Sequence, residues 1–245
     1  MDVKRIAAIV LSGAAGAAAL AAAPLVTPFS AATDAHLPAP WHVITLPKIP
    51  RHTSYTVVAQ DGRAVVKAEA DGSYANLVHP LKMSLASTPI LTWRWRVDRF
   101  PAASDLAVKS GDDVAAKVCV LFDLPLARLS FADRVKVELG RRLFDPDLPT
   151  ATICYLWDRT TTPGTWLPNI YTDRVRMLVL RSAAAGQQER WFEERRDLRS
   201  DFVRAFGSEA DGGLPPVSAI AIASDADNTG GTALAWFGDI ALVAE

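Results

Sequence analysis

Short strand-forming runs, repeated along the chain and separated by turn signals, constrain this fold more than any other feature. Turn signals such as Asp61-Gly62, Asp71-Gly72 and Pro163-Gly164 stand between the runs. The expected strands are 41–46, 54–59, 64–70, 74–78, 90–97, 114–122, 151–157, 174–180, 189–194, 217–224 and 233–243. Strands and helices do not alternate, which argues against a parallel α/β sheet. The pattern predicts a mainly β fold, an antiparallel β-sandwich of the jelly-roll kind with one or two short helices.

Two segments favour helices. Ser130 is a suitable N-cap for the first, and its apolar residues recur every fourth position on one face: Phe131, Val135, Leu139 and Leu143. The second is expected over residues 197–206, and Gly207 after it suits the end of a helix. Neither helix is long enough to form a domain of its own, so residues 37–245 are predicted to form a single β-sandwich domain.

The N-terminal segment has the composition of an export signal. Lys4 and Arg5 precede an uncharged run over residues 6–23, and small residues follow at 30–32. The pattern predicts a signal peptide over residues 1–32, with cleavage after Ala32 or alternatively after Ala35. An uncleaved membrane anchor is the alternative. We therefore expect a periplasmic or secreted protein that does not contact the membrane after cleavage.

Charge and cysteine content limit the partners. The formal net charge of −1 provides no general attraction to nucleic acid, and no nucleic-acid partner is expected. The oligomeric state stays open. Cys119 and Cys154 both lie within expected strands. An oxidising compartment would permit a cross-strand disulfide, while two buried free thiols are the alternative.

Strand alternation predicts which side chains share a face. Arg94 and Arg96 lie opposite Trp93 and Trp95, and Arg176 lies opposite Met177. If the strands at 90–97, 114–122 and 174–180 belong to one sheet, its outer surface carries a basic cluster of Arg94, Arg96, Lys117, Arg174 and Arg176.

Two loops offer groups for ligand binding. In residues 224–231, Asp225, Asp227 and Asn228 supply hard oxygen atoms that suit calcium, with Asp225 and Asp227 as candidate metal ligands. Turns in which these side chains bond their own backbone are the alternative. Asp112 and Asp113 are adjacent carboxylates that could pair with the arginines, join the first loop around one ion, or be architectural.

Aromatic residues add a further candidate surface. The chain has seven tryptophans. Trp93 and Trp95 are predicted to fill the core, whereas Tyr155 and Trp157 are candidates for stacking against sugar rings. Core or loop-anchoring roles are the alternative. Sequence motifs of common hydrolases, zinc proteases and nucleotide-binding enzymes are absent, so no catalytic residue is assigned.

Several segments carry a family resemblance. They include LTWRWRV, SGDDVAAKVCVLFD, TICYLWD, RVRMLVL and IAIASDADNTGGTALAWFGDIAL. Together they resemble the bacterial family called domain of unknown function 3047, a resemblance that implies no activity. The closing WFGDIALV is also similar to the last strand of galactose-binding-like jelly rolls, which by analogy implies carbohydrate binding.

The leading hypothesis is a jelly-roll module that binds a saccharide or another polar ligand, or a cell-envelope component. Its candidate ligand-binding residues are Arg94, Arg96, Asp112, Asp113, Tyr155, Trp157, Arg176, Asp225, Asp227 and Asn228. A polysaccharide-acting lyase or hydrolase, using Tyr155, Asp158 and Arg176, is the second hypothesis. A non-catalytic envelope scaffold is the third.

Overall fold

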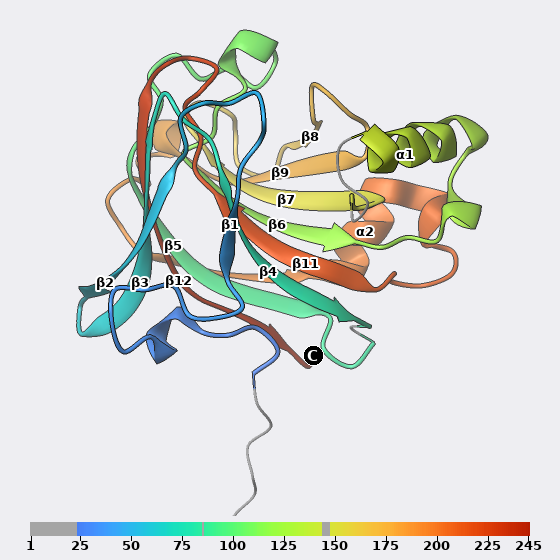
Figure 1. The fold of residues 1–245 in the computed structure, drawn as a ribbon, viewed down its shortest axis with the longest axis horizontal. Helices are drawn as coiled ribbons and strands as arrows, with labels where there is room; N and C mark the ends of the chain where they lie inside the picture. The colour runs from blue at the N-terminus through green and yellow to red at the C-terminus, as the bar shows by residue number, and fades with distance from the viewer. Residues whose placement is uncertain (1–23, 85, 144–147) are drawn as a thin grey trace, which may run out of the picture.

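The computed structural model describes residues 24–84, 86–143 and 148–245, and they form two β-sheets that pack face to face (Figure 1). The sheet orders are β1-β4-β11-β6-β7-β9-β8 and β10-β5-β12-β3-β2. The strands are β1 (His42–Ile44), β2 (Ser54–Gln60), β3 (Arg63–Asp71), β4 (Asn76–Met83), β5 (Ile90–Arg99), β6 (Ala116–Phe122), β7 (Ala151–Asp158), β8 (Trp166–Pro168), β9 (Val175–Ser182), β10 (Phe192–Asp197), β11 (Val217–Ala223) and β12 (Thr232–Val243). The predicted β-sandwich is confirmed, and β7 with β9 is a parallel pair within it.

An aromatic cluster joins the two sheets. Trp93 and Trp95 of β5 are buried, as predicted, and their rings lie 5.2 Å from Tyr155 and 5.5 Å from Trp157, respectively, between centroids. Aromatic rings in tilted contacts at this distance add stability beyond the area they bury. The centre of the sandwich is therefore filled by large rings contributed by both layers.

The seven-stranded sheet is apolar on both faces. In β6, Val118 and Val120 face the core between the sheets, whereas Cys119 belongs to a second apolar cluster on the opposite face. Every residue of β7 is buried. Strands that alternate apolar and polar residues have one solvated face, and the lack of alternation in β7 shows that both faces of this strand are shielded from bulk solvent.

The two helices both lie at the end of the sandwich where β6 finishes and β7 begins (Figure 1). In α2 (Leu198–Phe206), Asp197 accepts hydrogen bonds from two backbone N–H groups at the N-terminus. Gly207 ends the helix with a φ of 54°, a left-handed value that favours glycine. Phe202 packs on Phe122 of the core, with ring centroids 4.9 Å apart. This helix begins and ends as the sequence predicts.

The orientation of α1 (Phe131–Leu143) differs from the expectation. Ser130 caps it, accepting a hydrogen bond from the Asp133 N–H. However, its apolar stripe is exposed instead of buried, and Val137 is the residue that packs inward. The side chain of Leu143 lies outside the described part of the chain. Because α1 extends beyond the strand ends, the stripe meets no second layer.

Residues 25–32 belong to the folded domain. Phe29 is fully buried and stacks on Trp41, and Val26 lies in the same core. The Ser30 hydroxyl donates a hydrogen bond to Asp239 of β12. The predicted signal peptide extends across these residues, and its part at residues 1–23 lies outside the described chain. Cleavage stays a prediction, but a cut after Ala32 would remove core side chains.

The two cysteines form a disulfide, which resolves the alternatives left open by the sequence. Cys119 and Cys154 are direct partners across the antiparallel β6–β7 pair, with Cα atoms 4.0 Å apart. Both side chains point away from the core between the sheets. The bond therefore crosslinks the centre of the seven-stranded sheet on its outer face.

Replacing both cysteines by alanine is expected to lower the free energy of unfolding by about 3–4 kcal/mol, because the bond closes a loop of 35 residues in the unfolded chain. Urea denaturation of the double variant and of the wild type, each with and without a reductant, measures this. The reductant should destabilise only the wild type, to the level of the variant. Equal stability of all four samples would contradict the structural role.

Candidate ligand-binding groove

A groove of about 1040 Å³ lies on the outer face of the seven-stranded sheet. Its floor is aliphatic and includes the Cys119–Cys154 disulfide, because β4, β6, β7, β9 and β11 direct small or apolar side chains outward. The floor residues are Val78, Pro80, Cys119, Leu121, Cys154, Val175, Met177, Ala219 and Ala221. Ile44 and Leu46, at and beyond the end of β1, line one side, and Asn169 and Tyr171 line another.

A buried ion pair forms one end of the groove. The Lys117 ammonium donates a hydrogen bond of 2.7 Å to Asp225, which also accepts from the Val114 N–H. Burial raises the pKa of Asp225 to about 6, although Lys117 lowers it. Burial alone would lower the pKa of Lys117, but the Asp225 carboxylate together with Tyr74 and Asp112 outweighs this and holds that pKa above its ordinary value. The two groups therefore carry opposite charges at neutral pH.

The two predicted loops meet at this end. Asp113 is fully buried and accepts hydrogen bonds from the N–H groups of Asn228 and Thr229 and from the Thr229 hydroxyl. Asn228 in turn donates to Lys109 O and to the Tyr171 hydroxyl. The sequence left open whether these acidic loops meet; in the structure they do, and the hydrogen bonds that Asp113 accepts join them.

Asp112 and Asp227 line the groove without a salt-bridge partner among the described residues. Burial raises the pKa of each carboxyl, and a neighbouring carboxylate raises it further, although Lys117 lowers it. Tyr74, Asn76 and Asn169 line the same end. The groove therefore combines a long aliphatic floor with one end rich in hydrogen-bond acceptors.

The geometry at the predicted calcium site favours hydrogen bonding over metal coordination. One carboxylate oxygen from each of Asp113, Asp225 and Asp227 lies within 4.8 Å of the others. However, both oxygens of Asp225 and both of Asp113 already accept hydrogen bonds, and the Lys117 ammonium supplies a positive charge. Calcium needs six to eight oxygen ligands, so this set fits it poorly.

The expected basic cluster does not form, because its members lie in different sheets. Arg94 and Arg96 are on β5 of the five-stranded sheet, whereas Arg176 is on β9 of the other. Arg94 stacks on Trp191 and Arg96 pairs with Asp98. The Arg176 side chain donates to Ala205 O at the end of α2. None of these three arginines lines the groove.

Tyr155 and Trp157 lie in the core and cannot stack on a ligand from solvent. Both are fully buried. The Tyr155 hydroxyl donates a hydrogen bond of 2.7 Å to Asp201, which Arg196 also contacts. Burial raises the pKa of this tyrosine well above its ordinary value. The outward neighbours of these residues, such as Cys154, line the groove instead.

Sequence reasoning missed most of the groove. Tyr74 comes from the loop before β4, whereas Asn169 and Tyr171 come from the loop after β8, and no spacing pattern links the two loops. A signal for the apolar floor did exist. The run Thr152-Ile153-Cys154-Tyr155-Leu156 has almost no polar alternation, which is typical of a strand covered on both faces.

The fold and the groove define a two-sheet β-sandwich with a large ligand-sized groove over its wider sheet. The chain belongs to the family described as "Protein of unknown function (DUF3047)", whose model matches residues 39–241, so the family prediction is confirmed. No curated protein matches the chain.

The chain is also similar to solved structures. One of them is the K2 cleaved adhesin domain of Lys-gingipain, with 12% sequence identity, a TM-score of 0.38, and coverage of 90% of this chain and 97% of that one. A likeness of this degree indicates nothing about a ligand.

Proposed function

We propose that the chain is a binding protein for an amphiphilic ligand, with an apolar body on the groove floor and a polar head at the acidic end. The observation that carries the proposal is the position of the aliphatic floor beside Asp112 and Asp227 in one groove of about 1040 Å³. Sites for small molecules are mostly apolar clefts of this size with a few converging polar groups.

The floor suits an extended apolar body. Lys117 of β6 and Asp123, which directly follows β6, mark the two ends of the groove, a separation of about 20 Å at the usual rise of a strand. Between them the floor offers aliphatic side chains and a disulfide instead of exposed aromatic rings. Flat sugar rings prefer aromatic partners, so this surface favours an alkyl body over a chain of sugars.

The polar end suits a head that donates hydrogen bonds. Asp112 and Asp227 are acceptors without ionic partners in the described chain, and Lys117 is already paired with Asp225. A head with hydroxyl or ammonium groups would satisfy these carboxylates, whereas an anionic head would be repelled.

A saccharide head is favoured by one further observation. The rings of Tyr74 and Tyr171 lie at the polar end, where they could contact the apolar face of one sugar. The polysaccharide-acting enzyme has less support, because Tyr155 and Arg176 of its candidate set lie outside the groove. Export, the periplasmic location and an envelope partner stay predictions from the sequence.

Isothermal titration calorimetry with four probes tests the proposal. Dodecyl maltoside, dodecylamine and dodecanoate share one tail and differ in the head, and maltose has no tail; the detergents are used below their micelle concentrations. We expect the first two to bind, dodecanoate to bind more weakly, and maltose to bind least. Maltose binding as tightly as dodecyl maltoside would favour a pure saccharide site, and no binding of any probe would refute the proposal.

A groove-filling variant provides the control. Ala221 lies on the floor in β11, and Ala221→Trp is expected to weaken dodecyl maltoside binding about tenfold or more. Ala241 lies in the central strand β12 of the other sheet, and Ala241→Trp should leave binding unchanged. Circular dichroism checks that both variants are folded. Equal losses in both variants would place the ligand elsewhere.

A further inference from the structure

The apolar stripe of α1 is held outward by the way the helix attaches. Phe131, Val135 and Leu139 are 81%, 47% and 53% exposed, respectively. On the opposite side, Val137 is buried and Arg141 donates a hydrogen bond to Leu148 O. Because these contacts fix one face of α1 to the body, the stripe stays on the surface.

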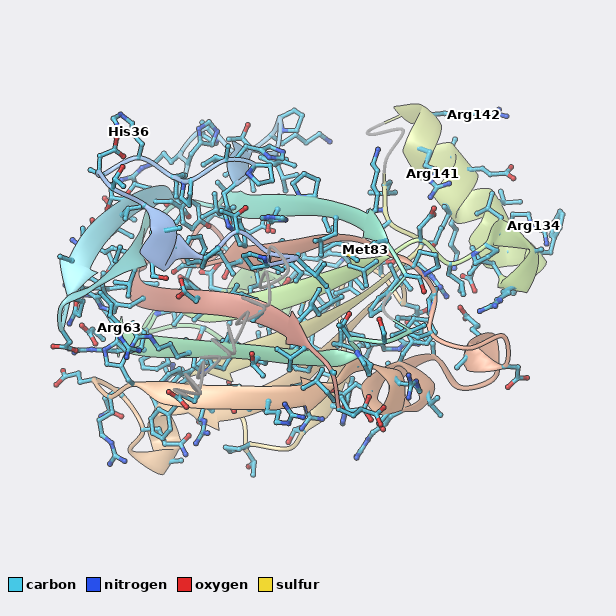
Figure 2. The ribbon with its side chains drawn as sticks, turned by 90° about the horizontal axis from the view of Figure 1, so that it is seen from below. His36, Arg63, Met83, Arg134, Arg141 and Arg142 are labelled. Carbon is cyan, nitrogen blue, oxygen red and sulfur yellow. A yellow bond between two sulfur atoms is a disulfide. The ribbon has the colours of Figure 1, made fainter. Side chains whose placement is uncertain are left out.

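Basic side chains flank this stripe. The sequence of α1 contains Arg134, Lys136, Arg141 and Arg142 against Asp133 and Glu138, an excess of two positive charges. Figure 2 shows Arg142 directed away from the body and Arg141 on the side toward it. Lys136 and Arg142 are exposed next to the stripe. An amphipathic helix with apolar residues beside Lys and Arg is typical of a helix that lies on a lipid surface.

The size of the stripe argues against a stable protein partner. Each side of a stable protein complex buries roughly 800 Å², far more than three side chains can provide. A lipid surface has no such requirement, since insertion of a few apolar side chains and attraction to anionic headgroups suffice. No helix in the described residues is long and apolar enough to span a membrane.

We propose that α1 docks this protein on an anionic lipid surface. The proposal departs from the expectation that the processed chain does not contact the membrane. It is carried by α1 alone and does not depend on the groove. The two features are nevertheless adjacent, because Arg141 of α1 also lines the groove at the end opposite Lys117. Docking would therefore place that end of the groove next to the lipid.

Hydrogen exchange of the full chain, with and without vesicles, tests the proposal. Because exchange is measured for each segment, protection of α1 is distinguished from a membrane contact made by the N-terminal segment. With vesicles of phosphatidylglycerol and phosphatidylcholine, we expect the α1 amides to exchange about tenfold more slowly. Vesicles of phosphatidylcholine alone should give little protection. The variant Phe131→Gln/Leu139→Gln should lose the protection, since burial of each side chain contributes more than tenfold to binding.

One further variant serves as a control, and another as a second test. Val43 is exposed on β1, and Val43→Asn should retain the protection. If Phe131→Gln/Leu139→Gln speeds exchange of the α1 amides even without vesicles, Lys136→Gln/Arg142→Gln takes its place as the test. That variant should weaken vesicle binding most at low salt. The proposal is overturned if α1 exchanges equally with and without anionic vesicles. It is also overturned if neutral vesicles protect α1 equally, or if protection appears without vesicles as protein concentration rises, which would indicate a second copy of the chain.

Discussion

Replacing Lys117 by methionine is expected to lower the free energy of unfolding by about 3–5 kcal/mol at neutral pH. The substitution keeps an unbranched side chain one heavy atom shorter but leaves the Asp225 carboxylate, which is 6% exposed, without its cation. A buried charge that loses its partner is far more costly than the pair itself. Urea denaturation at about pH 7.5 measures the loss.

The loss in this variant should shrink as the pH falls. Burial already raises the pKa of Asp225 to about 6, and removal of Lys117 raises it further. A carboxyl with a raised folded-state pKa weakens folding above that pKa, and the penalty is absent below the pKa of the unfolded state. Protonation at about pH 5 should therefore recover much of the stability.

Lys67→Met is a matched control for this prediction. Lys117 lies over the ring of Tyr74, and Lys67 likewise pairs with a carboxylate, that of Glu69, and lies over a ring, that of Trp236. Its partner is half exposed, so the expected loss is within about 1 kcal/mol. Similar losses in the two variants, or a loss in Lys117→Met that does not depend on pH, would contradict the role assigned to the buried pair.

Removing residues 1–32 is expected to destabilise the domain more than removing residues 1–23. The longer deletion takes away Phe29, which is fully buried, together with Val26 and the bond from Ser30 to Asp239. Truncation of a buried Phe alone costs about 3–5 kcal/mol, so the chain that starts at residue 33 should be at best marginally folded. Thermal unfolding followed by circular dichroism compares the two chains.

Phe29→Ala in the full chain separates the loss of packing from the loss of chain length. It should account for most of the effect of the longer deletion. If the chain that starts at residue 33 unfolds at the same temperature as the one that starts at residue 24, residues 25–32 are dispensable. We therefore expect export, if it involves cleavage, to cut before residue 25, which mass spectrometry of the exported protein would locate.

The sequence was sufficient to predict the strands and much less so to predict the site. Alternation in β5 correctly placed Trp93 and Trp95 in the core, and Asp197 with Gly207 correctly bounded α2. These features depend on local chemistry, which a short window of sequence contains. One short strand, β8, was missed because Trp166–Pro168 has too few residues to show a period.

Errors arose where the arrangement of strands decides the outcome. Alternation correctly put Arg176 opposite Met177. It does not say which of these two faces of β9 packs on the other sheet, and in the structure Met177 lies on the outer face, toward the groove. Nor does it say which strands are neighbours, so Arg94 was wrongly grouped with Arg176. The acidic loops were singled out as candidate polar sites, but their approach to each other and their hydrogen bonds with Lys117 and Thr229 needed coordinates.

Methionine methyl resonances offer the most direct test that the groove is the ligand site. The chain has three methionines, of which Met177 lies on the groove floor and Met83, labelled in Figure 2, does not line the groove. Titration with dodecyl maltoside, followed by NMR of methyl-labelled methionine, should shift the Met177 signal to saturation and leave the Met83 signal in place. A Met177 signal that does not move while calorimetry detects binding would contradict the account.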